Sequence, residues 1–378
     1  MKPLLLRSLV RFALLSTFAT KATTLFAQGN LAPAGAPAPG MRTLTQVEPR
    51  TPIGSLPFTI TTPGSYYVTT NLTGTSGTNG ITITVSDVRV DLSGFVLTGI
   101  GSSLSGVQVP NTGLTNISVR NGTVRGWPMH GLEVNSDYAV TVEHIDASEN
   151  GRSGIFCLSG GAANFVVRHC NATRNNTANA GGSGIVTSGG TIVDCTAMAN
   201  LNSAPGISAG SGALVSHCLV RNNSGPGISA NGASVLDCES FSNTGVGIYA
   251  GADSLVARCS SVGNTSDGIV LLRQCQATDN HSVDNGFFGT GAGIRASSFG
   301  NRIAGNIVSG NTTGVLVDAG ATNNVVIQNT AGRNPPSGAV GSANFVFNAF
   351  TIFGPTNNAF NPATGAITNL NPWANISH

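Results

Sequence analysis

Short apolar segments alternate with glycine and asparagine along most of this chain, and the alternation is periodic. From about residue 80 onward, a glycine followed by Ile, Val or Leu recurs at intervals of 20 to 30 residues. These glycines are Gly80, Gly106, Gly131, Gly154, Gly184, Gly206, Gly227, Gly247, Gly268, Gly293 and Gly314. Self-similarity at this period indicates a solenoid, in which each repeat is one structural unit that packs on its neighbours.

A second marker lies between these glycines and keeps the same phase. It is a cysteine with an asparagine five residues later: Cys170 and Asn175, Cys195 and Asn200, Cys218 and Asn223, Cys238 and Asn243, Cys259 and Asn264, and Cys275 and Asn280. The same step leads from Asn306 to Asn311 and from Asn329 to Asn334. We predict that the six cysteines occupy one interior position on successive coils. The asparagines are then expected to form a ladder of side-chain amides.

The repeats predict strands rather than helices, because Gly, Asn, Thr and Val fill every unit and are poor helix formers. An apolar residue stands three positions before each cysteine, and residues three apart in a straight strand face opposite sides. If both face the interior, the chain bends between them. A second bend near the asparagine, and the glycine that opens the next strand, give three strands and three turns per coil. The sequence therefore predicts an all-β, single-stranded parallel β-helix of about eleven coils.

Several segments resemble a known family. The repeats VLDCESFSN–TGVGIY and RIAGNIVSGN–TTGVLV are similar to those of right-handed parallel β-helix proteins of the pectin-lyase-like superfamily, over about residues 80–335. The segments VRVDLSGFVLTG and VRNGTVRGW resemble the front end of secreted bacterial members. The resemblance implies right-handed coiling and a cleft along one strand and its flanking loops. It does not fix a function, because this scaffold carries lyases, hydrolases, epimerases, adhesins and tailspikes.

The N-terminus has the pattern of a secretory signal. Lys2, Arg7 and Arg11 precede an apolar run over 12–19, and a cleavage position follows Ala27. The predicted organisation is a signal peptide 1–27, a Pro/Gly/Ala linker 28–42, an N-terminal cap 43–79, repeats 80–334, and a C-terminal cap or tail 335–378. Because the apolar run is shorter than the roughly 20 residues of a spanning helix, we expect a secreted or extracytoplasmic protein without an integral membrane span.

Charge excludes some partners. Charged residues make up only 9% of the chain, against about 25% in ordinary soluble domains. The formal charge of +2 arises from the N-terminus: from Gln28 onward there are 14 Arg against 16 Asp and Glu, without basic clusters. This distribution favours neither nucleic acid nor an anionic membrane as a partner.

The seven cysteines admit two interpretations. Side chains stacked at the coil spacing of about 4.8 Å point past one another rather than together, which favours an interior ladder of free thiols. One or two bridges between neighbouring coils are the alternative. The sequence contains no CxxC motif, and we predict no metal site.

Two sets of residues are candidates for chemistry. The first set directly precedes the ladder cysteines and is expected at the surface: His169, Asp194, His217, Asp237 and Arg258, followed by Gln274. Such a column could bind a cation or a sugar chain or supply an acid and a base. The alternative is that alternating charges at a surface bend only avoid repulsion between like charges.

The second set faces outward on the strand that Gly-Ile opens. Its members are Gln108, Glu133, Phe156, Val186, Ser208, Ser229, Tyr249, Val270, Arg295 and Leu316. Of these, Glu133, Phe156, Tyr249 and Arg295 are the candidates for binding substrate, because the aromatic rings can stack on sugars.

These observations lead to a functional hypothesis with two alternatives. We expect an exported protein that binds, and in one version processes, a polysaccharide or cell-surface glycan. The enzyme alternative is a lyase or hydrolase of acidic polysaccharide that uses the His169–Arg258 column or Glu133 and Arg295. The third alternative is a structural or adhesive surface protein. No cofactor is predicted, with Ca²⁺ as the alternative; the lyases of the family use clustered acidic Ca²⁺ ligands, and this sequence shows no clear acidic cluster.

Overall fold

The structure, a computed structural model, describes residues 49–111, 113–136, 138–159, 164–286, 291–334, 343–358 and 371–378. The chain divides into two units, Met1–Pro49 and Arg50–His378, and all described strands belong to the second. The predicted signal peptide 1–27 and linker 28–42 lie outside the described residues.

Each coil of the second unit contributes one strand to a 13-stranded sheet, which we call row 1. Its strands are β2 (Phe58–Ile60), β5 (Ile81–Ile83), β8 (Val107–Val109), β10 (Leu132–Asn135), β12 (Ile155–Leu158), β15 (Ile185–Thr187), β18 (Ile207–Ala209), β21 (Ile228–Ala230), β24 (Ile248–Ala250), β27 (Ile269–Leu271), β30 (Ala292–Ala296), β33 (Thr313–Val317) and β36 (Phe345–Val346). Row 1 corresponds to the strands that Gly-Ile was expected to open.

The other strands form a 26-stranded sheet that is folded into two rows. Row 2 contains β1 (Thr51–Ile53), β3 (Gly64–Val68), β6 (Val88–Asp91), the first halves of β9 (Ile117–Arg125) and β11 (Val140–Ser148), β13 (Phe165–Arg168), β16 (Thr191–Val193), β19 (Leu214–Ser216), β22 (Ser234–Leu236), β25 (Leu255–Ala257), β28 (Gln276–Thr278), β31 (Arg302–Ala304), β34 (Val325–Ile327) and β37 (Ile352–Phe353). Row 3 contains β4 (Leu72–Thr73), β7 (Val96–Thr98), the second halves of β9 and β11, β14 (Asn171–Thr173), β17 (Thr196–Met198), β20 (Leu219–Arg221), β23 (Glu239–Phe241), β26 (Ser260–Val262), β29 (His281–Val283), β32 (Ile307–Ser309), β35 (Thr330–Gly332) and β39 (Asn375–Ser377), beside which β38 (Thr356–Asn358) pairs.

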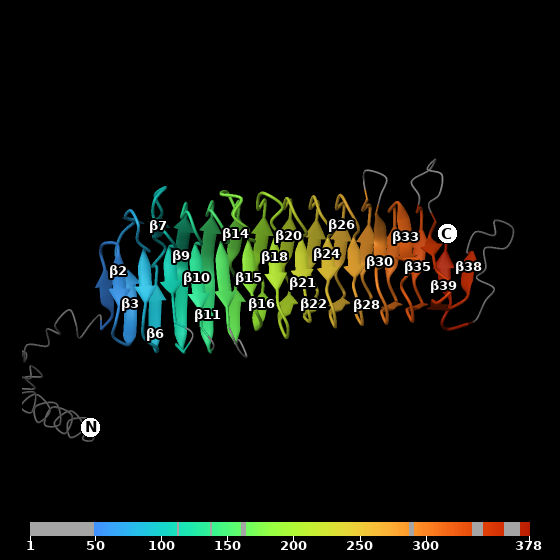
Figure 1. The fold of residues 1–378 in the computed structure, drawn as a ribbon, viewed down its shortest axis with the longest axis horizontal. Coiled ribbons are helices and arrows are strands. Elements are labelled where there is room, and N and C mark those ends of the chain that lie inside the picture. Colours follow the sequence, from blue (N-terminus) through green and yellow to red (C-terminus); the bar gives the residue numbers. More distant parts are fainter. Residues whose placement is uncertain are drawn as a thin grey trace, which may run out of the picture. The chain divides into compact units, whose positions relative to one another are not determined.

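The strands of one row pair in parallel with those of the next coil, and the coils follow one another in sequence order along the stack (Figure 1). The described residues contain no helix, and the interior is filled by Ile, Val, Leu, Ala and Cys side chains from all three rows. This confirms the all-β parallel β-helix. Row 1 has 13 strands, close to the eleven coils expected. Of the predicted cap 43–79, the described part carries β1 to β4, and β2 and β3 pair with the following coil.

Glycine opens row 1 because neighbouring coils approach too closely there for a side chain. A Cβ atom at Gly227 would lie 2.6 Å from the carbonyl oxygen of Gly247 and 2.7 Å from Nδ2 of Asn243. The same crowding by the next coil's carbonyl is found at Gly184 and Gly247. The recurring glycine is thus a steric requirement of coil packing.

The bend between rows 2 and 3 is made by one residue in the left-handed region, directly before the interior residue. His169, Asp194, His217, Asp237, Arg258 and Asp279 have φ values from 52° to 56°. This confirms the predicted bend before each cysteine. It also shows that residues other than Gly and Asn take the left-handed geometry, while the interior residue itself does not.

A buried ladder of asparagine side chains follows row 3 on successive coils. It consists of Asn150, Asn175, Asn200, Asn223, Asn243, Asn264, Asn285, Asn311, Asn334 and Asn344. At Asn223, the side-chain amide donates to Oδ1 of Asn243 at 2.9 Å and to the carbonyl oxygen of Ala197 at 3.1 Å. The ladder therefore satisfies backbone and side-chain groups that would otherwise be buried without partners.

Five of the six predicted ladder cysteines share one interior column: Cys170, Cys195, Cys218, Cys238 and Cys259. The placement of Cys275 in this column was wrong. Its backbone N–H donates to Oδ1 of Asn301, in the turn between rows 1 and 2. The column continues with Asn280, which accepts from the N–H of Cys259 at 2.9 Å, and then with Asn306 and Asn329.

The cause of this error is the length of the module. A three-residue strand and a two-residue turn together span five residues, so a +5 step joins the turns on either side of row 2 as well as those on either side of row 3. Cys259 to Asn264 joins the turns before and after row 3, whereas Cys275 to Asn280 joins the turns before and after row 2. Asn280 therefore stands in the cysteine column, and Asn285 takes its expected place in the asparagine ladder.

All seven cysteines are buried and unpaired in the structure. Burial raises the pKa of the Cys157 thiol to about 12. Contact with the thiol of Cys195 and burial both raise the pKa of Cys170. Cys157 and Cys170 therefore act as small protonated core side chains. Among the described residues, no helix is both long and apolar enough to cross a membrane.

Candidate functional site

The turn column predicted from the sequence exists, with a change at one end. His169, Asp194, His217, Asp237 and Arg258 all occupy the left-handed position of the bend before row 3, on consecutive coils. Gln274 is not part of this column, because it precedes Cys275 in the turn before row 2; Asp279 takes its place. His144 extends the column by one coil, and its ring stacks on that of His169 with centroids 5.0 Å apart.

The charges of this column are largely paired with one another. Arg258 donates to both carboxylate oxygens of Asp237, at 2.7 and 2.8 Å, and these bonds lower the pKa of that carboxyl group. His169 Nδ1 lies 3.9 Å from Asp194 Oδ2. A shallow hollow of about 420 Å³ opens beside His217, Asp237 and Arg258. Because these side chains are mostly exposed, the pairs contribute little to stability.

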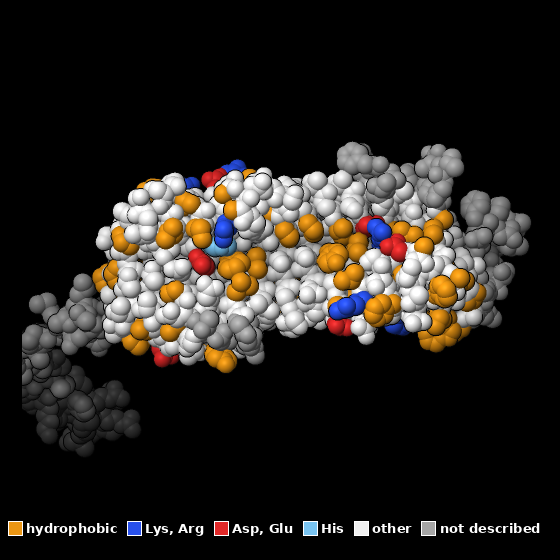
Figure 2. Space-filling model, in the orientation of Figure 1, with side chains coloured by type: hydrophobic (Ala, Val, Ile, Leu, Met, Phe, Trp, Pro, Cys, Tyr) orange, Lys and Arg blue, Asp and Glu red, His pale blue; other side chains and the backbone are white. Residues whose placement is uncertain are grey.

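The outward positions of row 1 lie in the register that was predicted. Gln108, Glu133, Phe156, Val186, Ser208, Ser229, Tyr249, Val270, Arg295 and Leu316 are consecutive Cα partners. Most of them are half-buried, and Val270 is buried. On this face, charged side chains lie near β10 and near β30, with uncharged side chains between these two groups, and a further charged group lies lower in the view, near β28 (Figure 2).

The group at β10 combines an aromatic platform with polar groups. His130 stacks on Phe156 with ring centroids 4.3 Å apart, and its Nδ1 accepts from the backbone N–H of Ser153. Burial lowers the pKa of His130 to about 4, against the opposing field of Glu133, so the imidazole is neutral at pH 7. Glu133 accepts a 2.7 Å hydrogen bond from the hydroxyl of Ser105. Glu133 and Phe156 were predicted from the sequence, whereas His130 was missed, although it directly precedes the marker Gly131.

The group at β30 surrounds Arg295. Its Nε lies 3.0 and 3.1 Å from the two carboxylate oxygens of Asp318, and its Nη1 lies 3.7 Å from Asp267 Oδ2. Asp267 is 7% exposed and accepts from the backbone N–H of Ala292. The two aspartates were missed from the sequence, although Asp267 directly precedes the marker Gly268 and Asp318 stands two residues after the predicted outward residue Leu316. Tyr249 lies between the two groups, two coils from Arg295 in the register.

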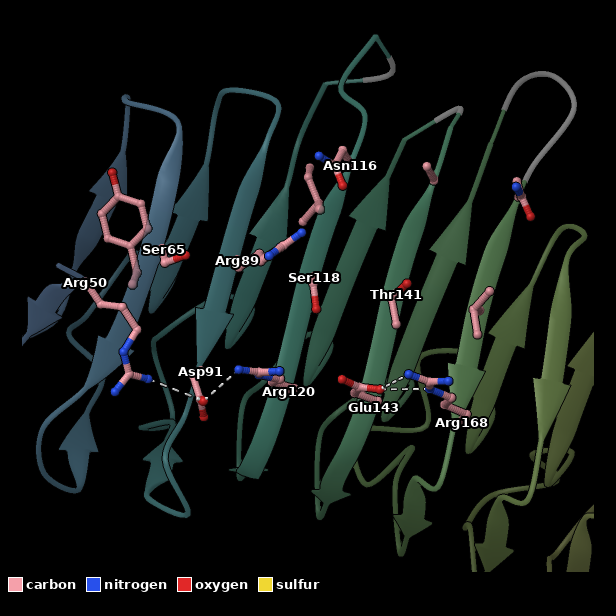
Figure 3. Close-up of a pocket in the computed structure, with 15 residues that line it drawn as sticks. Arg50, Ser65, Arg89, Asp91, Asn116, Ser118, Arg120, Thr141, Glu143 and Arg168 are labelled. Carbon is pink, nitrogen blue, oxygen red and sulfur yellow. Dashed lines mark hydrogen bonds and ion pairs between the residues drawn. The ribbon is translucent and has the colours of Figure 1, made fainter. Parts of the chain in front are cut away.

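A third feature was also missed, a hollow of about 470 Å³ on row 2 near the start of the stack. We call it the arginine hollow, and its charged lining residues are Arg50, Arg89, Asp91, Arg120, Glu143 and Arg168 (Figure 3). A signal was present in the strands VRVD, SVRN and VVR, each with an arginine at an outward position. This signal could not be interpreted from the sequence, because only the register between coils shows that the three strands lie near one another in row 2.

Across the described ranges, no three His, Cys, Asp or Glu side chains are arranged to hold a metal ion.

The fold defines a right-handed parallel β-helix repeat protein. The family described as "Right handed beta helix region" matches residues 105–253. Among solved structures, the chain is similar to the A-module of the mannuronan C-5 epimerase AlgE4 of Azotobacter vinelandii, with a TM-score of 0.61 and 15% identity over 77% of this chain and 91% of that one. The A-module of AlgE6 from the same organism gives a TM-score of 0.61 and 16% identity, over 84% and 91%.

A third similar structure is the catalytic domain of a GH87 α-1,3-glucanase in complex with tetrasaccharides, with a TM-score of 0.50 and 13% identity over 86% of this chain and 63% of that chain. At these identities, the likeness shows the shared fold. Comparison with curated protein sequences yields no significant match.

Proposed function

We propose that this protein binds a polysaccharide along the outer face of row 1. The observation that carries the proposal is the unbroken register of outward side chains from Gln108 to Leu316, one per coil. A polymer of repeating units that lies along the stack meets one side chain at each step of about 4.8 Å. Half-buried Phe156 and Tyr249 offer ring faces for the apolar faces of sugars, and Glu133 offers an acceptor for hydroxyl groups.

The similar structures support the polysaccharide class. Two are named as mannuronan epimerase modules, and the third is a glucanase domain with bound tetrasaccharides. No residue role is carried over from them. The proposal includes export to a secreted or extracytoplasmic location, which rests on the N-terminal pattern of Lys2, Arg7 and Arg11 before an apolar run.

Chemical processing of the polymer is a second candidate, and the group at β10 favours it. A neutral, buried imidazole at His130 and the carboxylate of Glu133 lie on the same face, and the charge of Glu133 acts on the imidazole. A carboxylate and an imidazole are the groups that general acid–base catalysis uses. The reaction would be that of a polysaccharide lyase or a glycoside hydrolase.

Binding is tested by titration calorimetry with neutral and acidic polysaccharides. We expect Phe156→Ala and Tyr249→Ala each to weaken binding about tenfold, which corresponds to roughly 1.4 kcal/mol. The control is Tyr138→Ala, since Tyr138 is 57% exposed and lies outside row 1. Unchanged affinity in both row 1 variants would refute binding on this face. Absence of binding to every glycan would favour the structural or adhesive alternative.

Processing is tested on the same polymers by following new reducing ends, for hydrolysis, and unsaturated products, for lyase cleavage. We expect Glu133→Gln to abolish turnover while binding is retained, because the amide keeps the shape but loses the base. Turnover that persists in this variant would exclude Glu133 as the acid or base.

A further inference from the structure

The arginine hollow presents a regular array of charges and hydroxyl groups. One line of outward positions on row 2 reads Asp91, Arg120, Glu143, Arg168 on successive coils. The neighbouring line reads Ser65, Arg89, Ser118, Thr141. Figure 3 shows the two lines side by side, with the charged line nearer the ends of the strands.

The positive charge of the hollow exceeds its negative charge. Asp91 is shared by Arg50 and Arg120, at 3.5 and 3.3 Å, and Glu143 accepts from Nε of Arg168 at 2.8 Å. Among the lining residues that the structure describes, four arginines therefore face two carboxylates. Arg89 is exposed and has no ion-pair or hydrogen-bond partner among the described residues.

We infer that the arginine hollow is a second binding site, for an anionic glycan that bears carboxylate or sulfate groups. The guanidinium of Arg89 can donate two parallel N–H bonds to such a group. Arg120 and Arg168 lie about two coil spacings apart. Besides their bonds to Asp91 and Glu143, their guanidinium groups can donate N–H bonds to further anionic groups of the same polymer. The hydroxyl groups of Ser65, Ser118 and Thr141 line the hollow beside them and suit the hydroxyl groups of sugars.

The lining favours a glycan over a nucleic acid. Proteins bind single-stranded nucleic acid through a positively charged groove that follows the phosphates. Single strands also need exposed aromatic rings on which bases stack. Among the described lining residues, the one aromatic ring is that of Tyr66, which is 7% exposed and whose hydroxyl donates to the carbonyl oxygen of Thr62.

This site is independent of the row 1 face. The hollow belongs to the outward positions of row 2, and Phe156 belongs to row 1. The two proposals can therefore fail separately, since each predicts a loss of binding for a different variant.

The experiment is a titration of the full chain with polygalacturonate, a sulfated glycan, neutral dextran and a single-stranded DNA oligonucleotide. We expect Arg89→Ala to weaken binding of the anionic glycans about tenfold. Arg89→Lys should weaken binding less, because lysine keeps the positive charge although it cannot donate two parallel hydrogen bonds as a guanidinium does. Arg302→Ala is the matched control: it removes a row 2 arginine at an outward position several coils away. Binding should also fall as salt is raised.

Comparison of the two anionic polymers shows whether carboxylate or sulfate is the preferred group. The inference is overturned if Arg89→Ala, folded as judged by circular dichroism, binds anionic glycans as tightly as the wild type. It is also overturned if neither polymer binds, if dextran binds equally well, or if the oligonucleotide binds more tightly. If Phe156→Ala abolishes polygalacturonate binding and Arg89→Ala does not, the anionic polymer binds on row 1 alone.

Discussion

At the scale of single residues, burial decides which polar groups are reactive. His130 is 4% exposed, and its imidazole is held between the ring of Phe156 and the backbone of Ser153. His217, by contrast, is exposed at a left-handed bend and faces away from the adjacent Cys218, which is buried. His217 and Cys218 are therefore adjacent in sequence but do not form a thiol–imidazole pair. The histidine with the perturbed pKa lies elsewhere, on the row 1 face.

His130 should make stability depend on pH. Its pKa is about 4 in the folded protein and about 6.5 when exposed, so the unfolded state binds more protons between these values. The free energy of unfolding should fall by roughly 3 kcal/mol as the pH drops from 6.5 through 4. In His130→Asn, the side-chain oxygen can accept from the backbone N–H of Ser153, but no imidazole is present to take up a proton. The decrease in the free energy of unfolding that comes from His130 should therefore be absent in this variant.

Urea unfolding at pH 7 and pH 4 measures the effect as the difference between wild type and variant. His281→Asn, which removes an exposed imidazole, serves as the control and should keep the wild-type dependence. An identical loss of stability in wild type and His130→Asn would contradict the buried, neutral imidazole.

At the scale of elements, the unit of construction is a short strand with its turn. Each turn places one residue at the surface and the next in the interior, and the interior residues stack into the cysteine column and the asparagine ladder. Glycine is required where row 1 begins, because the carbonyl oxygen of the next coil occupies the place of a side chain. Geometry within one coil is thus dictated by contacts with the next.

Gly227→Ala should destabilise the protein by roughly 1–3 kcal/mol, the range for overpacking a close-packed interior. The added Cβ would meet the hydroxyl of Ser240 and the carbonyl oxygen of Gly247, and the backbone must shift to relieve this. Gly320→Ala is the control, since a Cβ at Gly320 meets no atom within 4 Å. Chemical denaturation compares the three proteins, and equal stability of Gly227→Ala and Gly320→Ala would contradict the steric role.

At the scale of the whole molecule, stability is distributed along the stack. Each coil contacts mainly its neighbours, as in other solenoids. The asparagine ladder runs without interruption from Asn150 to Asn344 and links these coils into one hydrogen-bonded system. Ionic contacts are few in this sequence, where 9% of residues are charged. Packing and hydrogen bonds between coils therefore carry most of the stability.

The thiols report on the integrity of the stack. Because all seven cysteines are buried and the reactive form is the thiolate, iodoacetamide should label none of them in the native protein. In denaturant without reductant, all seven should be labelled, as counted by mass spectrometry. Fewer than seven labels in the unfolded, unreduced protein would reveal disulfide bridges and contradict the free-thiol ladder.

Much of the architecture was predictable because it depends on residues that have the same structural role in every coil. Gly-Ile marks the start of row 1 wherever it occurs, so the outward register from Gln108 to Leu316 could be derived without coordinates. The interior position of Cys218 and the amide ladder at Asn223 followed from the same periodicity. These features are local, repeated, and set by steric fit and by hydrogen-bond satisfaction.

Other features were decided only by the tertiary structure, because they depend on which turn or strand lies beside which. A five-residue step crosses row 2 as well as row 3, so the sequence could not show that Cys275 lies outside the cysteine column. The arginine hollow joins Arg89 and Arg120, which stand in coils without a cysteine marker. The burial that lowers the pKa of His130 comes from the neighbouring coil. Sequence periodicity determined the scaffold, and contacts between coils determined its candidate sites.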